Sequence, residues 1–164
     1  YQSNLWKNIN STIKQKNKNI PKFEVFGTDF ETKDGTCVRD FIHVTDICEG
    51  HMLALKYLLN TDVKGSKFYN LSNCEGFSVL EIIEKCSKVS GVNIDFCAAT
   101  RRPGDPAVLI GNSNKIRDEL GWRPSQDLTS MVTSAWLALN KIQKDSKITS
   151  KREIQSNNHL FFKN

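Results

Sequence analysis

Two short stretches that contain arginine carry the side chains best suited to binding chemistry. Residues 38–44 read Val-Arg-Asp-Phe-Ile-His-Val, and residues 101–105 read Arg-Arg-Pro-Gly-Asp. The guanidinium group of arginine is planar, stays charged at any cellular pH and can donate two hydrogen bonds to one phosphate. Two such sites on one small domain favour a doubly charged anion, such as a diphosphate, as the ligand.

Each arginine site also has a structural interpretation, which stays open on the residues alone. Arg39 has acidic neighbours at Asp40 and Asp46, with which it can form an ordinary surface ion pair. Arg101 and Arg102 precede Pro-Gly and can belong to a solvated turn.

The five cysteines and the charge distribution exclude several classes of function. No Cys-x-x-Cys pair occurs, which argues against a zinc site and favours a reduced, cytoplasmic protein. The net charge of +5 is concentrated at the ends: residues 1–22 contain five lysines and no acid, and residues 141–164 contain six basic residues against two acidic ones. A nucleic-acid-binding face would place basic and aromatic residues on the folded body. No apolar run approaches the roughly 18 residues of a membrane span, so neither nucleic acid nor a membrane is expected as a partner.

Short apolar runs alternate with helical patterns along the body of the chain, and this order predicts an α/β fold. Helices are expected after residue 44, after Ser78, after Asn112 or Ser113, and after Asp127. Strands are predicted at residues 23–26, 38–44, 68–71 and 94–98.

Caps and apolar faces refine two of these helices. Ser78 and Glu81 have the spacing of a capping box, and Thr45 or Asp46 is the predicted cap of the helix after residue 44. His51 is interpreted as a packed histidine on the inner face of that helix. The other residues predicted on this inner face are Ile47, Ala54, Leu55, Leu58 and Leu59.

Composition divides the chain into three parts. Residues 1–22 are predicted to form an N-terminal helical segment, and residues 23–145 hold the apolar residues of a core. Residues 146–164 are polar and are predicted to be a disordered tail.

Several of these stretches resemble one family. Six stretches are similar to UDP-glucose 4-epimerases. They are Val25-Phe26-Gly27-Thr28-Asp29-Phe30, the run from Thr32 to Asp46, Tyr69-Asn70-Leu71, Ser78-Val79-Leu80-Glu81, Arg101 to Ala107, and Leu120-Gly121-Trp122. These epimerases belong to the extended short-chain dehydrogenase/reductase family, and the resemblance covers residues 4–140. It implies a fold of two lobes, a Rossmann lobe for NAD and a smaller C-terminal lobe for the UDP-sugar.

The resemblance implies binding roles for nine residues. Arg39 and Arg102 are expected to hold the diphosphate, and Asp105 to accept from the ribose hydroxyls. Asn4 and Leu5 match the start of the substrate lobe, where Asn4 is expected to contact a phosphate, and Glu24 and Phe26 match the strand that meets the uracil. Phe41 replaces a tyrosine near the sugar, and Leu109 stands at a position linked to tolerance of N-acetyl sugars.

The chain matches only the substrate-binding C-terminal lobe, and the Rossmann NAD lobe is missing from it. No dinucleotide fingerprint can be built from its nine glycines. The family's Tyr-x-x-x-Lys pair is absent too, because Leu5, Thr61 and Asn73 follow the three tyrosines at that spacing. We therefore expect no catalytic residue here, and no epimerisation by the chain alone. The alternatives are a non-catalytic remnant or nucleotide-binding module, and a related UDP-sugar-modifying enzyme.

A missing lobe would leave an apolar surface uncovered. We expect Val25, Phe26, Ile42 and the strand at residues 68–71 to form that surface. The expected partners are a UDP-sugar and a separate NAD-binding lobe, with self-association through the exposed edge as a further outcome.

Overall fold

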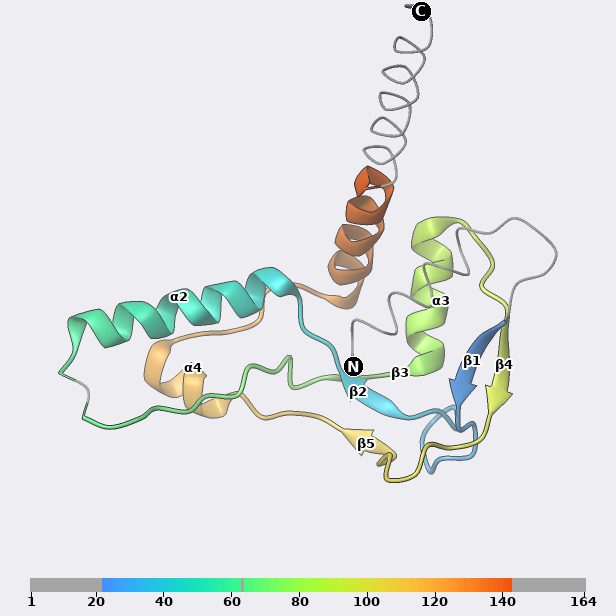
Figure 1. The fold of residues 1–164 in the computed structure, drawn as a ribbon, viewed down its shortest axis with the longest axis horizontal. Helices are drawn as coiled ribbons and strands as arrows, with labels where there is room; N and C mark the ends of the chain where they lie inside the picture. Colours follow the sequence, from blue (N-terminus) through green and yellow to red (C-terminus); the bar gives the residue numbers. More distant parts are fainter. Residues whose placement is uncertain (1–21, 63, 143–164) are drawn as a thin grey trace, which may run out of the picture.

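A computed structural model describes residues 22–62 and 64–142 (Figure 1). The N-terminal helical segment predicted at residues 1–22, apart from Lys22, and the tail predicted at residues 146–164 lie outside the described residues. So do the predicted site residues Asn4 and Leu5.

The described strands form two small sheets. Strand β1 (Phe23–Phe26) pairs in parallel with β4 (Phe96–Ala99), and Phe23 lies opposite Phe96. The second sheet has the order β3-β2-β5, with the short central strand β2 (Val38–Asp40) antiparallel to β3 (Gly76–Ser78) and parallel to β5 (Val108–Leu109). The α/β class and the strands at 23–26 and near 94–98 are confirmed, and β2 confirms the start of the predicted 38–44 strand.

Glycine explains how closely the second sheet is packed. A Cβ atom at Gly76 would lie 2.4 Å from Cγ1 of Val38 and 2.6 Å from Cδ1 of Ile110. Both distances are well inside van der Waals contact, so β3 can lie against β2 only with glycine at this position.

The helices of the described residues are α2 (Val44–Asn60), α3 (Val79–Ser90), α4 (Asn114–Leu120) and a helix over residues 128–142. The capping box predicted for α3 is confirmed, since the Ser78 side chain accepts from the amide of Glu81 and the Glu81 side chain accepts from that of Ser78. Gly91 ends α3 in the left-handed conformation (φ 69°), which glycine adopts without strain.

The predicted cap of α2 is wrong. The helix begins at Val44, and the residue before it, His43, accepts a hydrogen bond from the amide of Thr45 through Nδ1. Nε2 of the same ring lies 2.8 Å from Oγ of Ser134. The imidazole thus takes the capping role that the sequence pattern assigned to Thr45 or Asp46, and it also links α2 to the helix over 128–142.

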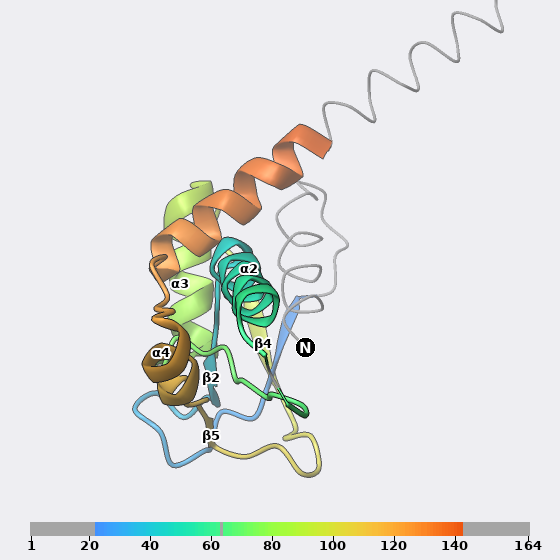
Figure 2. The ribbon, with the colours of Figure 1, turned by 90° about the vertical axis from the view of Figure 1, so that its left-hand side faces the viewer.

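The main core lies between α3, the helix over 128–142 and β1 (Figures 1 and 2). Period-3.6 apolar positions of both helices face each other there, as amphipathic helices require. The buried members are Phe23, Val25, Phe41, Ile82, Ile83, Cys86, Ile94, Leu128, Met131 and Val132. Val25 is 1% exposed, so its predicted place on an uncovered surface is wrong.

A second contact region ties α2 to the chain after α4. Trp122 is buried and donates from Nε1 to the backbone oxygen of Asp46 at 2.9 Å. The carboxylate of Asp46, 1% exposed, accepts from the amide and hydroxyl of Ser125 at 3.1 and 2.8 Å and from the amide of Gln126 at 3.2 Å. One buried carboxylate therefore fixes the turn that leads into the last described helix.

The inner face predicted for α2 is largely wrong. Within the described chain the buried residues of α2 are Asp46 and Gly50. Leu55, Leu58 and Leu59 are exposed, and so is His51, which is therefore not a packed histidine. The helix turns its small, close-packed side inward, where Gly50 lies against Leu71.

The strand predicted at residues 68–71 is not formed. This segment runs beneath α2 as irregular chain, and among the described residues no strand pairs with it (Figure 1). Phe68 is 77% exposed. A β-strand needs a neighbouring strand for its backbone hydrogen bonds, so the local β-pattern alone could not produce one.

Asp46→Ala should lower the free energy of unfolding by about 3 kcal/mol, because two backbone amides and a hydroxyl lose their buried charged acceptor. Urea denaturation measures this change. Asp118→Ala is the matched control: Asp118 is exposed and pairs with Arg117 at 3.3 Å, so less than about 0.5 kcal/mol is expected. Equal effects of the two variants would contradict the assigned role of Asp46.

Candidate functional site

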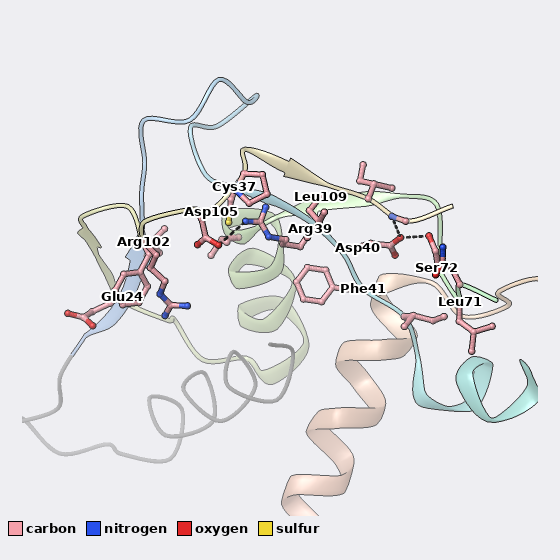
Figure 3. A pocket seen from close by; sticks show the side chains of 18 of the residues that line it. Glu24, Cys37, Arg39, Asp40, Phe41, Leu71, Ser72, Arg102, Asp105 and Leu109 are labelled. Atoms are coloured by element: carbon pink, nitrogen blue, oxygen red, sulfur yellow. Dashed lines mark hydrogen bonds and ion pairs between the residues drawn. The ribbon is translucent and has the colours of Figure 1, made fainter. Parts of the chain in front are cut away.

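A cavity of about 880 Å³ opens between the two sheets and is the site at which most of the predicted binding residues meet (Figure 3). Its walls come from β1, β2 and β5, the loop that carries Arg102 and Asp105, and the irregular segment after Phe68. Seven of the nine predicted site residues line it: Glu24, Phe26, Arg39, Phe41, Arg102, Asp105 and Leu109.

Arg39 projects from the central strand β2 into this cavity. Its Nη1 donates to the backbone oxygen of Val38 at 2.8 Å, and its Nη2 lies 3.5 Å from Oδ1 of Asp105. The Arg39 and Asp105 side chains are each 15% exposed, and Nη2 is buried without a hydrogen bond. A buried guanidinium donor without a hydrogen bond is a costly arrangement, and an oxygen of a bound anion would satisfy it. Arg39 therefore pairs with Asp105 and not with Asp40 or Asp46, the surface partners that the sequence had left open.

Arg102 approaches the same cavity from the loop after β4. Its guanidinium carbon lies 3.9 Å from the centre of the Phe26 ring, which is cation–π geometry. The aromatic face presents the charge toward the cavity, at the end where Glu24 also lies (Figure 3).

Arg101, the neighbour of Arg102, has a structural role. Its Nε donates to Oδ1 of Asp29 at 2.6 Å, and its Nη2 donates to the backbone oxygen of Asp29. Its guanidinium carbon also lies 4.2 Å from the centre of the Phe30 ring. These contacts hold the pKa of Asp29 below its usual value, chiefly through the hydrogen bond from Arg101. The two adjacent arginines therefore differ in function: Arg101 closes the loop after β1, and Arg102 lines the cavity.

Asp40 forms the floor of the cavity at the end far from Arg102 (Figure 3). Its carboxylate accepts from the Ser72 hydroxyl, from the amide of Asn73 at 3.0 Å and from the amide of Gly111 at 3.1 Å. It thereby binds two segments that are distant in sequence to β2. A Cβ atom at Gly111 would lie 2.8 Å from Cβ of Ser72, so this approach requires glycine.

The cavity becomes apolar at the Asp40 end. Phe41 is buried beneath it, Leu109 is 58% exposed at its rim, and Ile110 and Leu71 complete the lining. A ligand held at its charged part by Arg39 and Arg102 would extend its uncharged part toward these side chains.

Tyr69 lines the cavity and is anchored outside it. Its hydroxyl donates to Oε2 of Glu119 at 2.7 Å, and that bond is the main cause that raises the pKa of Tyr69 to about 12. The ammonium of Lys115 lies 5.2 Å from the centre of the ring. The tyrosine is neutral at physiological pH and fixes the position of the segment after Phe68.

Sequence reasoning missed several cavity residues, although motifs that it quoted contain some of them. Asp40 stands next to Arg39, and Tyr69, Asn70 and Leu71 were matched as a group without a site role. Ser72 and Gly111 gave no local signal, because they reach the cavity only through Asp40, 32 and 71 residues away.

The N-termini of α2 and α3 do not fit a dinucleotide. A dinucleotide site needs free amides at a helix N-terminus after a glycine turn. The α2 N-terminus is capped by His43 and the α3 N-terminus by Ser78 with Glu81, and no glycine lies at either strand-to-helix junction. No group of three or more metal-binding side chains occurs in the described part of the chain. No helix in that part is long and apolar enough to cross a membrane.

Comparison with known proteins identifies what the chain is similar to. A family model described as GDP-mannose 4,6 dehydratase matches residues 9–135. The UDP-glucose 4-epimerase of Bacillus subtilis is 44% identical over 117 residues, which are 71% of this chain and 34% of that protein. The UDP-glucose 4-epimerase of Halalkalibacterium halodurans is 47% identical over 113 residues, 68% of this chain and 33% of that protein. The chain thus spans about a third of the length of the curated relatives it matches.

Solved structures agree with these matches. The UDP-glucose 4-epimerase of Stenotrophomonas maltophila, with bound NAD and formylated UDP-arabinopyranose, superposes with a TM-score of 0.78 at 37% identity. That match covers 87% of this chain and 41% of the other. The UDP-Glc/GlcNAc 4-epimerase of Campylobacter jejuni gives a TM-score of 0.69 at 43% identity, covering 82% and 40%.

The cysteines should react with iodoacetamide in a fixed order. The hydrogen bond with Ser113 lowers the pKa of the exposed Cys74, whereas burial raises the pKa of Cys37 and raises that of Cys86 to about 12. Only the thiolate is alkylated, so at neutral pH the lowered pKa gives Cys74 the larger reactive fraction. Among these three cysteines, peptide mass mapping should find Cys74 modified first, Cys37 only as the pH rises, and Cys86 only after unfolding.

Ser113→Ala tests the cause of this order. Loss of the hydrogen bond should move the pH midpoint for alkylation of Cys74 upward and leave Cys37 unchanged. An unchanged midpoint for Cys74 would show that Ser113 does not stabilise the thiolate.

Proposed function

Since this chain belongs to the extended short-chain dehydrogenase/reductase family, matching its GDP-mannose 4,6 dehydratase model, we propose that it is the UDP-sugar-binding part of a UDP-glucose 4-epimerase. The reaction of the whole protein would interconvert UDP-glucose and UDP-galactose. The relatives named UDP-glucose 4-epimerase and the UDP-sugar bound in a structural neighbour support this assignment.

The observation that carries the proposal is the shared cavity of Arg39 and Arg102. One guanidinium donor of Arg39 is buried without a hydrogen bond, and Arg102 is presented on the Phe26 ring. A diphosphate has two charged groups a few ångströms apart, and each can take a bidentate pair of bonds from an arginine. Arg39 lies on β2 and Arg102 on the loop after β4, so a ligand bound by both would present an anionic group to each.

The remaining assignments follow the polarity of the cavity. Asp105, beside Arg39, would accept from the ribose hydroxyls, and the β1 residues Glu24 and Phe26 would border the uracil. Phe41 and Leu109 lie toward the apolar end, where the sugar would reach. Asn4 would contact the phosphate, with Leu5 beside it at the start of the substrate lobe.

Binding and chemistry would be divided between this chain and the part of the fold that it does not span. The family uses NAD, which would supply hydride transfer, and the N-termini of α2 and α3 are closed by their caps. Tyr57 and Tyr69 have no lysine four residues further on, and the Tyr69 hydroxyl donates to Glu119. The chain alone would therefore bind a UDP-sugar without epimerising it. The free state of all five cysteines supports a reducing compartment such as the cytoplasm.

Arg102→Ala and Arg39→Ala should each weaken UDP binding by about 10- to 150-fold, since each removes charge-assisted bonds worth roughly 1.5–3 kcal/mol. Isothermal titration calorimetry with UDP measures the affinity. Arg101→Ala is the matched control, because Arg101 neighbours Arg102 but pairs with Asp29 outside the cavity. It should change the affinity less than about threefold.

UMP separates a diphosphate site from a general nucleotide site. UMP lacks one phosphate, so its binding should be weaker than that of UDP and less sensitive to Arg102→Ala. Absence of UDP binding to the unaltered chain would make the remnant interpretation correct. Tighter binding of UDP-N-acetylglucosamine than of UDP-glucose would favour the related UDP-sugar enzyme, for which the Campylobacter jejuni neighbour is the model.

A further inference from the structure

Asp105 places a negative charge beside Arg39 in a cavity that is otherwise suited to an anion (Figure 3). Its Oδ1 lies 3.5 Å from Nη2 of Arg39, and both side chains are 15% exposed. A charge-assisted N–H···O bond is about 2.7–2.9 Å long, so the two groups attract each other without forming a hydrogen bond. Nη2 makes no hydrogen bond elsewhere. Arg39 is thus held near a carboxylate and keeps a donor for a ligand.

A tight turn fixes Asp105 relative to the second arginine of the cavity. The amide of Asp105 donates to the backbone oxygen of Arg102 at 3.2 Å, with Pro103 and Gly104 between them. Gly104 has φ 81°, and a proline followed by a residue with positive φ is the pattern of a type II turn. The turn therefore presents one cation and one anion, at its two ends, to the same cavity.

The carboxylate of Asp105 acts against incoming anions. A phosphate that accepts from Nη2 of Arg39 would bring its negative charge close to Asp105, because the two groups share that side of the guanidinium. Like charges placed together in a binding site cost affinity, and proteins use this repulsion to suppress wrong ligands. A diphosphate by itself is attracted by Arg39 and Arg102 but is repelled by Asp105.

A ribose reverses this repulsion. A carboxylate accepts hydrogen bonds and cannot donate them, and its two oxygens have about four acceptor positions. The neighbouring hydroxyls of a ribose are donors, so they stabilise the charge of Asp105 when a phosphate takes its place beside Arg39. Arg39 and Asp105 then exchange each other for the phosphate and the diol of one ligand. Inorganic pyrophosphate has no diol and cannot complete this exchange.

We propose that Asp105 determines the selectivity of the cavity. Its ion pair with Arg39 keeps out diphosphates that carry no diol, and a nucleoside diphosphate opens the pair because its ribose supplies donors to the carboxylate. This inference deepens the proposed function and rests on it for the uridine nucleotide as ligand. The exclusion of free diphosphates needs only the pair itself.

Asp105→Asn tests the exclusion, since it removes the charge and nearly keeps the shape of the side chain. Inorganic pyrophosphate and UDP are titrated into the unaltered chain and the variant by calorimetry in metal-free buffer. Pyrophosphate should bind the variant about fivefold more tightly, because no carboxylate then opposes it. The preference for UDP over pyrophosphate should fall about tenfold, because the variant also loses the charged acceptor of the diol.

Asp29→Asn is the matched control. Asp29 pairs with Arg101, the neighbour of Arg102, at 2.6 Å and does not line the cavity. The substitution changes the net charge of the chain by the same amount as Asp105→Asn. It should leave the affinities for UDP and pyrophosphate within about twofold of those of the unaltered chain.

A nucleotide without the diol tests the unaltered chain itself. Dideoxy-UDP, without the 2′ and 3′ hydroxyls, keeps the diphosphate and the uracil. It should bind the unaltered chain about tenfold more weakly than UDP, and the difference should narrow to about threefold in Asp105→Asn. The first of these comparisons does not depend on how the variant folds.

The inference is wrong if pyrophosphate gains no affinity in Asp105→Asn; a loss shared equally with UDP would mean that the carboxylate only holds Arg39 in place. It is also wrong if Asp29→Asn gives pyrophosphate the same gain, or if the unaltered chain binds UDP and dideoxy-UDP equally well. Absence of UDP binding together with a gain for pyrophosphate in Asp105→Asn would overturn the proposed function, while the exclusion of free diphosphates by Asp105 stands.

Discussion

The carboxylate of Asp40 holds together the segments from which the cavity is made. It accepts hydrogen bonds from Ser72, Asn73 and Gly111, which lie in two parts of the chain with no ladder between them. The central strand β2 is only three residues long, too short to position these segments through backbone pairing alone. The partly buried carboxylate of Asp40 takes over that task, and Arg39 beside it can then project into an opening of defined shape.

The adjacent β2 residues Arg39 and Asp40 thus have different roles. Arg39 turns toward Asp105, whereas the next residue, Asp40, accepts hydrogen bonds from the chain segments at the other end of the cavity. A similar division occurs at Arg101 and Arg102, of which one closes a loop and the other lines the cavity. In both pairs, a residue that fixes the surrounding chain neighbours an arginine that lines the cavity.

The accuracy of the sequence predictions followed the range of the interactions concerned. Local signals succeeded: the Ser78–Glu81 capping box and the Gly91 terminus depend on residues three or four apart. Predictions that needed distant partners were less complete. The strand at residues 68–71 has no neighbour in the described chain, and β5 and the Asp40 contacts arise only when remote segments meet. For α2, the apolar stripe was interpreted as the face packed on the core, but Leu55, Leu58 and Leu59 are exposed, because periodicity does not show which side of a helix its neighbours cover.

The two arginines of the cavity lie against separate sheets. Arg39 belongs to the β3-β2-β5 sheet, and Arg102 rests on Phe26 of the β1-β4 pair. A ligand bound by both guanidinium groups would therefore connect two sheets that share no strand. A bound ligand would restrict the motion of the two sheets relative to each other. Without the ligand, the two sheets would be free to move apart and together.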